Sequence, residues 1–119
     1  ESFIKSYEGQ FNVVVCQNDN EAYGAMDAMK AANITYGVDG DVILISYDAT
    51  HDGLQYTLDG AINCNVECNP IQAETVAGVI QAMATGGSYE KTTQAFVAPG
   101  ITSEYATTMT QEILDGRAY

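Results

Sequence analysis

The sequence predicts an α/β domain with three layers, α/β/α, around a mostly parallel sheet. Short runs of β-branched residues alternate with stretches of helical periodicity in the order β-α-β-α-β-α-β-α. The runs at residues 11–16 and 42–46 are apolar almost throughout, which is typical of strands buried on both faces of a parallel sheet. The 119 residues are enough for one small domain with one core.

The first half of the chain divides into two strand–helix pairs. Residues 11–16 are the first strand, and the helix that follows is capped by Asp19 or Asn20. Residues 42–46 are the second strand, and residues 51–59 form a short helix. Apolar residues at helical spacing give the first of these helices a buried face: Ala22, Ala25, Met26 and Met29.

The second half adds two further strand–helix pairs. Residues 61–68 are a half-polar third strand, and residues 70–85 are a long helix. Residues 93–98 are the fourth strand, and Ser103 caps a last helix that ends at Leu114. The long helix carries an apolar stripe: Val76, Val79, Ile80 and Met83.

The composition argues against several classes of function. The chain has 16 acidic residues and only four Lys and Arg, for a net charge of −12, whereas nucleic-acid binding depends on basic side chains. The three cysteines and single histidine lack the spacing of a zinc site or a disulfide, so small buried thiols are the simpler interpretation. No apolar stretch approaches the roughly 20 residues of a membrane helix. We expect no cofactor, no metal and no nucleic-acid partner.

Polar side chains follow the first two strands at the point where each strand ends. Asn18 follows the first strand and Asp48 ends the second. Parallel strands release such residues at one edge of the sheet, which is where ligands of open α/β sheets bind. An amide beside a carboxylate suits a hydroxyl-rich small molecule, although Asn and Asp also occur at strand ends as caps and turns.

Other candidates for the site are weaker. Glu67 ends the half-polar strand, where it either accepts hydroxyl protons or is simply solvated, and Cys68 after it can share the cleft. His51 is interpreted as a surface residue. The sequence has no nucleophile elbow, phosphate loop or Cys/His pair, and nothing in the spacing requires Asp48 and Glu67 to form a glycosidase pair. We therefore expect a protein that is not an enzyme.

Four segments, in order, resemble the type I periplasmic sugar-binding proteins of ABC transporters, the ribose- and galactose-binding group. QNDNEAYGAMDAMKAA resembles that family's N-D-x-x-A-x-G-A stretch, and VILISYDAT resembles its V-x-x-G-F-D-G-T stretch. LDGAINCNVECNP resembles the strand that ends in proline before the hinge. The tail, with ITSEYA and a final Arg117-Ala118-Tyr119, resembles the galactofuranose-binding branch.

The resemblance implies which residues contact a sugar. Asn18 and Asp48 would hydrogen-bond sugar hydroxyls, and the third contact would come from the strand that ends in Glu67 and Cys68. Ribose binders have glutamine about where Cys68 stands, whereas the VEC sequence resembles the galactofuranose branch and favours Glu67. Ser46-Tyr47 departs from the Gly-Phe that usually precedes the aspartate.

The resemblance also implies a fold and a domain plan, that of a periplasmic binding protein type I lobe. Residues 1–68 would belong to the C-terminal lobe of a two-lobe protein, residues 69–99 would cross the hinge and pack on the N-terminal lobe, and residues 100–119 would return. We expect the chain to begin inside a larger protein. The apolar stripe of residues 70–85 would then be covered by a second polypeptide, such as the remaining lobe or a swapped copy.

The function implied by the resemblance is that of an extracytoplasmic solute-binding protein. It would bind a monosaccharide between two lobes and present it to the membrane permease of an ABC transporter. The alternative is the effector-binding domain of a lactose-repressor-family transcription regulator, which shares the fold and a similar N-D-x-x-A-x-G stretch.

Overall fold

A computed structural model describes residues 2–89 and 102–119 of the chain. It divides into two compact units: unit 1 comprises Glu1–Cys68 with Thr102–Tyr119, and unit 2 is Asn69–Ile101. That residues 1–68 belong to one lobe of a two-lobe protein stays a prediction. That the segment after it crosses a hinge stays a prediction.

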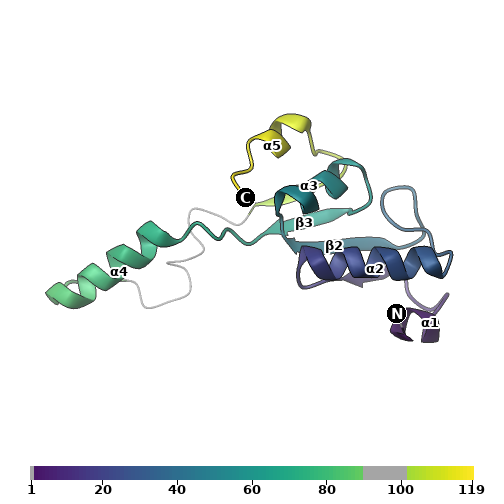
Figure 1. Ribbon diagram of the computed structural model, residues 1–119, viewed down its shortest axis with the longest axis horizontal. Helices are drawn as coiled ribbons and strands as arrows, with labels where there is room; N and C mark the ends of the chain where they lie inside the picture. The colour runs from purple at the N-terminus through teal and green to yellow at the C-terminus, as the bar shows by residue number, and fades with distance from the viewer. Residues whose placement is uncertain (1, 90–101) are drawn as a thin grey trace. The chain divides into compact units, whose positions relative to one another are not determined.

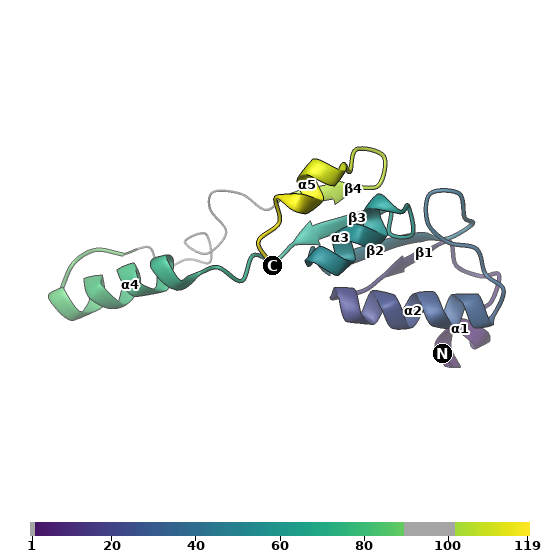
Figure 2. The same cartoon turned by 45° about the horizontal axis from the view of Figure 1, so that its top comes forward.

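Unit 1 is built on a four-stranded sheet in the order β1-β2-β3-β4 (Figure 1). The first three strands are parallel to one another, and only β4 runs antiparallel, on β3. Figure 2 shows β1 and β4 at the two edges of this sheet. The predicted α/β fold with a mostly parallel sheet is therefore confirmed. The strands are β1 (Val13–Val15), β2 (Ile43–Asp48), β3 (Cys64–Glu67) and β4 (Ser103–Tyr105).

Helices α2 and α3 pack on the strands of unit 1. The main core lies between α2 and the sheet, and it includes the predicted stripe residues Ala22, Met26 and Met29. A second small core joins α3 to α5 through Leu54 and Leu114. The helices of unit 1 are α1 (Ser2–Ser6), α2 (Asp19–Ala31), α3 (His51–Leu58) and α5 (Gln111–Asp115).

The opposite face of the sheet is exposed in the described part of unit 1. Side chains alternate between faces along a strand, and Val13, Val15, Ile43 and Tyr47 share one face because Val13 pairs with Ile43. These four side chains are between 41% and 59% exposed. The expectation that residues 11–16 and 42–46 are buried on both faces is therefore wrong, since the side chains that fill the core come from alternate positions such as Leu44.

The predicted last helix is wrong in its first half. Ser103–Tyr105 forms β4, which pairs with β3, and the helix starts only after Thr110, whose hydroxyl accepts a hydrogen bond from the Ile113 amide at 3.3 Å. Pairing with a distant strand has overridden the local helical pattern. The observed third strand, β3, is shorter than the predicted range of residues 61–68. The strand expected at residues 93–98 lies outside the described residues.

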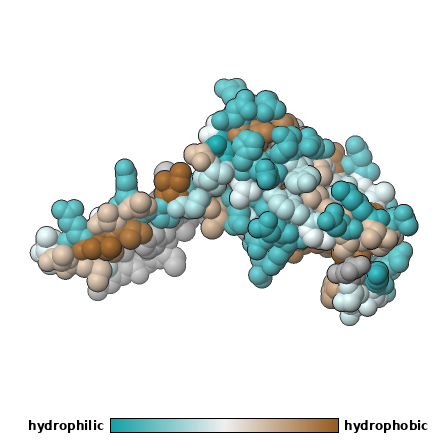
Figure 3. Space-filling model, viewed as in Figure 1, coloured by the Kyte–Doolittle hydropathy of each residue, from teal (hydrophilic) through white to brown (hydrophobic). Residues whose placement is uncertain are grey.

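Unit 2 contains α4 (Ala73–Thr85), which begins three residues later than the sequence pattern suggests. None of its residues is buried. Val76, Ile80 and Met83 are between 40% and 60% exposed, and Figure 3 shows apolar surface along this helix. None of the helices in the described ranges is long and apolar enough to span a bilayer. That a second polypeptide covers the apolar side of α4 stays a prediction.

The loop before β2 depends on a close backbone approach at Gly37. Its φ is +88°, in the left-handed region, and a Cβ at this position would lie 2.3 Å from the carbonyl oxygen of Gly60. That carbonyl accepts a hydrogen bond from the Val38 amide at 2.9 Å, so it has little freedom to move. Gly9 also has a left-handed φ of +72°, but nothing lies within 4 Å of its added Cβ.

We expect Gly37→Ala to lower the free energy of unfolding more than Gly9→Ala. Both substitutions place alanine in the left-handed region, which costs about 1–2 kcal/mol, and only Gly37 adds a steric clash. Urea unfolding of the two variants measures the difference. Equal losses of stability would show that the Gly37–Gly60 contact relaxes freely.

Candidate functional site

The carboxyl ends of β1, β2 and β3 meet at one edge of the sheet because these strands are parallel. The β2–β3 register pairs Asp48 with Glu67. The amide of Cys68 donates to the carbonyl oxygen of Asp48 at 3.1 Å. Asn18 follows β1 at the same edge. The backbone thus brings the four candidate residues of the sequence analysis to one edge, while their contacts with a ligand stay a prediction.

Asn18 is the N-cap of α2, so the expectation that Asp19 or Asn20 caps this helix is wrong. The Oδ1 atom of Asn18 accepts from the Glu21 amide at 2.8 Å, and Oε2 of Glu21 accepts from the Gln17 amide at 2.8 Å. These reciprocal bonds satisfy free amides at the start of the helix. The Nδ2 amide of Asn18 has no hydrogen-bond partner among the described residues, so it remains able to donate to a ligand.

Asp19 has a different and more demanding role. Its carboxylate is 2% exposed and accepts four hydrogen bonds. Oδ1 accepts from the Ser46 hydroxyl and from Nδ2 of Asn65, both at 2.7 Å. Oδ2 accepts from the amide of Thr50 at 2.9 Å and from its hydroxyl at 2.7 Å. One side chain therefore joins the start of α2 to β2, to β3 and to the start of α3.

No Lys or Arg forms an ion pair with Asp19 within the described ranges. Its negative charge is instead stabilised by neutral donors and by the positive end of a helix dipole, since Asp19 begins α2 and also reaches the N-cap of α3. The approach to α3 is so close that a Cβ at Gly53 would lie 2.1 Å from Oδ2 of Asp19. Glycine at this position is what allows the carboxylate to reach the helix.

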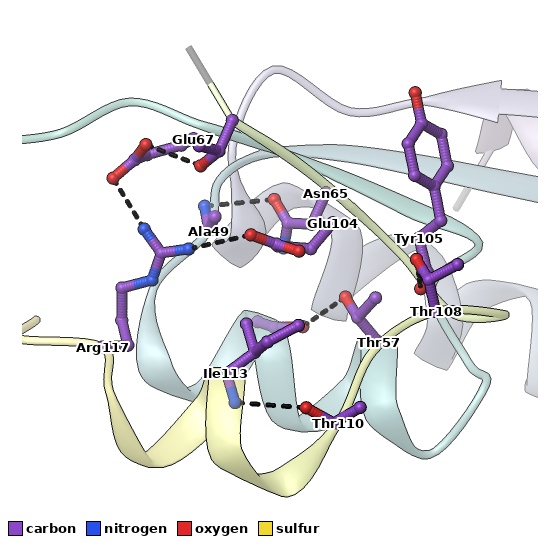
Figure 4. A network of polar contacts seen from close by, with 12 residues as sticks. Ala49, Thr57, Asn65, Glu67, Glu104, Tyr105, Thr108, Thr110, Ile113 and Arg117 are labelled. Carbon is purple, nitrogen blue, oxygen red and sulfur yellow. Dashed lines mark hydrogen bonds and ion pairs between the residues drawn. The ribbon is translucent and has the colours of Figure 1, made fainter. Parts of the chain in front are cut away.

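Asn65 supports the turn that follows Asp48. Its Oδ1 atom accepts from the Ala49 amide at 3.0 Å, a contact seen in Figure 4, while its Nδ2 atom binds Asp19. Asp48 and Ala49 have φ values of +99° and +55°, and both are non-glycine residues in the left-handed region. Such strain persists only where the surrounding structure holds it. Here the turn is restrained by Asn65, which accepts from the Ala49 amide, and by Asp19, which accepts from the Thr50 amide.

The carboxylate of Asp48 is partly buried and accepts no hydrogen bond within residues 2–89 and 102–119. Burial raises the pKa of this carboxyl above its ordinary value, and the negative charge of Asp19 raises it further. A partly desolvated carboxylate without donors at the edge of a parallel sheet is suited to accept hydrogen bonds from a ligand.

The carboxylate of Glu67 already accepts hydrogen bonds from residues 102–119. Its Oε1 atom accepts from Arg117 Nη1 at 2.6 Å and from the Tyr119 hydroxyl, and Oε2 accepts from the Thr102 hydroxyl at 2.7 Å. Figure 4 shows Arg117 between Glu67 and Glu104. Burial acts to raise the pKa of Glu67, but the bonds from Tyr119 and Thr102 and the charge of Arg117 outweigh it and hold the pKa below its ordinary value.

These contacts fix β3 to the point where the chain re-enters unit 1. The ligand role expected for Glu67 stays a prediction, and it requires the carboxylate to share its present donors. Cys68 is an exposed free thiol. The imidazole of His51 is exposed, and its backbone amide donates to the Tyr119 carbonyl at 2.9 Å.

The residues that support the site were not predicted from the sequence. Ser46 and Asn65 are fully buried polar residues within strands, and Asp19 is the buried carboxylate that joins them. A polar residue inside an otherwise apolar run was the available signal for Ser46. The arginine contact with Glu67 had no local signal, because the two residues are 50 positions apart.

The chain is similar to sugar-binding proteins of known sequence and structure. No family model matches the sequence. The chain is 34% identical over 87 residues to the fructose import binding protein FruE of Bifidobacterium longum, a match that covers 73% of this chain and 25% of FruE. The chain therefore spans about a quarter of that curated relative.

Solved structures extend the similarity to the fold. A Mycobacterium smegmatis protein in complex with β-D-fucofuranose is 33% identical with a TM-score of 0.72, over 89% of this chain and 33% of that one. A galactofuranose-binding protein is 26% identical with a TM-score of 0.74, over 96% of this chain and 37% of that one. The resemblance to type I periplasmic sugar-binding proteins is confirmed. Their fold is the fold of this chain.

We expect Gly53→Ala to destabilise the protein strongly, because the added methyl group collides with the Asp19 carboxylate. A loss of more than about 2 kcal/mol is expected for a clash in a buried polar network. The same substitution in an Asp19→Ala background should cost clearly less, since the obstructing atoms are gone. Urea unfolding of the double-mutant cycle measures this coupling. Additive effects would mean that another contact requires Gly53.

We expect Glu67→Gln to reduce the sensitivity of the protein to acid. Because the folded-state pKa of Glu67 is lowered, its stabilising contribution is present above the unfolded pKa and disappears as the pH falls through the folded one. The free energy of unfolding should therefore drop less between pH 7 and pH 3 in Glu67→Gln than in the wild type. Glu112→Gln, at an exposed position of α5, is the control, since it removes a carboxylate that no arginine contacts in the described residues.

Proposed function

We propose that this chain is part of a solute-binding protein that takes up a monosaccharide between two lobes and delivers it to the permease of an ABC transporter. Unit 1 would supply one half of the sugar site. The observation that carries the proposal is the position of two polar side chains at the carboxyl edge of a parallel sheet. They are the amide of Asn18 and the carboxylate of Asp48, which accepts no hydrogen bond within the described residues. The similarity to proteins named for sugar binding supports it.

The chemistry of this edge fits hydroxyl groups. Asn18 would donate through Nδ2, since its Oδ1 atom is already used by the helix cap. Asp48 would accept from neighbouring hydroxyls through charge-assisted bonds, which are stronger than neutral ones. Glu67 and Cys68 would provide the third contact at the end of β3. The names of the relatives support a small sugar, including furanose forms.

The proposed partners are a second lobe and a membrane permease. A second lobe, from the same protein or a separate chain, would cover the exposed apolar side of α4, since about 25 cal/mol is lost for each Å² of apolar surface left in water. Closure of the two lobes about a hinge would trap the sugar, and the closed form would be presented to the permease. The protein would act outside the cytoplasm and would not be an enzyme.

The alternative, an effector-binding domain of a lactose-repressor-family regulator, is not favoured. The relatives and structures described above are sugar-binding proteins, and FruE is named for import. We therefore keep transport as the single proposed function.

We expect Asp48→Asn to weaken sugar binding at least tenfold and to stabilise the protein at neutral pH. The raised pKa of Asp48 means that its ionised form is disfavoured on folding, so removing the charge helps the folded state above that pKa. Calorimetry of the full-length protein against fructose, fucofuranose and galactofuranose ligands measures the first effect, and urea unfolding at pH 7 measures the second.

The affinity of the wild type should also fall as the pH drops through the raised pKa of Asp48, because the protonated carboxyl is a weaker acceptor. Asp59→Asn, at an exposed position after α3, is the matched control and should bind like the wild type. Unchanged affinity in Asp48→Asn would remove Asp48 from the site.

A further inference from the structure

We propose that Asp19 is the positioning residue of this site: its buried carboxylate fixes the turn that presents Asp48, although Asp19 itself contacts no ligand. The inference rests on the sugar-binding function proposed above. It concerns a residue that lies next to Asn18 in sequence and is buried in the structure.

The hydrogen bonds of Asp19 lead to the turn that follows Asp48. Its Oδ2 atom holds both the amide and the hydroxyl of Thr50, two residues after Asp48. Its Oδ1 atom holds Nδ2 of Asn65, whose own Oδ1 atom holds the Ala49 amide. The two consecutive amides that follow Asp48 are therefore both tied, directly or through one intermediary, to the same carboxylate.

The backbone of the turn is strained. Asp48 and Ala49 occupy left-handed conformations at +99° and +55°, which L-residues adopt only under restraint. The restraint here includes the hydrogen bonds donated by the amides of Ala49 and Thr50, beside the bond from the Cys68 amide to the Asp48 carbonyl. If the carboxylate of Asp19 loses its acceptor capacity, the turn can relax to ordinary φ values, and such a change redirects the Asp48 side chain.

Asp19 also acts on Asp48 electrostatically. Of the ionisable groups near Asp48, Asp19 begins α2, His51 begins α3, and Glu67 and Cys68 lie at the end of the paired strand. The charge of Glu67 is balanced by Arg117 and its hydroxyl donors. Asp19 has no such cation within the described residues. Its charge therefore acts on Asp48 and raises the pKa of Asp48, an effect that a purely packing role would not produce.

The test is Asp19→Asn in the full-length protein. This substitution keeps the size of the side chain but replaces one of its two acceptor oxygens by an amide, which must face either the Thr50 donors or Nδ2 of Asn65, so one of the two ties to the turn is lost. We expect sugar affinity to fall at least tenfold and the carboxyl pKa of Asp48 to move down toward its ordinary value. Calorimetry measures the affinity, and carbon NMR of selectively labelled aspartate measures the titration. Asp27→Asn, on an exposed position of the same helix, should change neither.

A second pair of variants separates positioning from folding. Thr50→Ser keeps the hydroxyl that donates to Asp19 and should bind sugar like the wild type, whereas Thr50→Val removes it, together with the oxygen that caps the Gly53 amide, and should bind more weakly. This pair decides the matter if Asp19→Asn does not fold. Ser46→Ala removes one donor but leaves both bonds to Thr50, so its affinity should stay within about threefold of the wild type.

Wild-type affinity in Asp19→Asn, or equal affinities in the two Thr50 variants, would overturn the proposal. An Asp48 titration that does not move in a folded Asp19→Asn protein would overturn it as well. If the wild type binds none of the sugars, the proposed function fails, while the titration of Asp48 still shows whether Asp19 acts on it.

Discussion

The organisation of unit 1 depends on a buried negative charge that has no cation beside it among the described residues. Removing a carboxylate from water is costly unless fixed dipoles replace the lost hydration. At Asp19 those dipoles come from Ser46, Thr50 and Asn65 and from the ends of two helices. Because the donors lie on β2, β3 and α3, the charge is stabilised only when all three elements are assembled. The same requirement brings the ends of the strands together as a site.

Three carboxylates at this edge have three different environments. Asp19 is fully buried and satisfied by neutral donors. Glu67 is paired with Arg117 and holds the C-terminal segment against β3. Asp48 lies between them without a hydrogen-bond donor in the described structure, and its ionised form is disfavoured. A group that destabilises the free protein and has unused acceptor capacity is more easily explained by a ligand than by folding.

Both units also expose apolar surface to water. One face of the sheet in unit 1 and one side of α4 in unit 2 each carry large aliphatic side chains in contact with water. The chain covers a quarter to about two fifths of the proteins it resembles, so those proteins possess many residues with no counterpart here. Apolar surface of this kind is typical of an interface. It fits the proposed two-lobe protein without any change to the fold described here.

The sequence by itself determined the first three strand–helix pairs, the parallel sheet and the edge at which Asn18 and Asp48 lie. These features follow from periodicity, which is written within short windows of the chain. Only the tertiary structure decided that residues 103–105 form a strand, that Asp19 is a buried acceptor and that Arg117 holds Glu67. Those outcomes depend on partners 27 to 50 positions away, such as Asn65 for Asp19, and a local pattern carries no information about contacts at that separation.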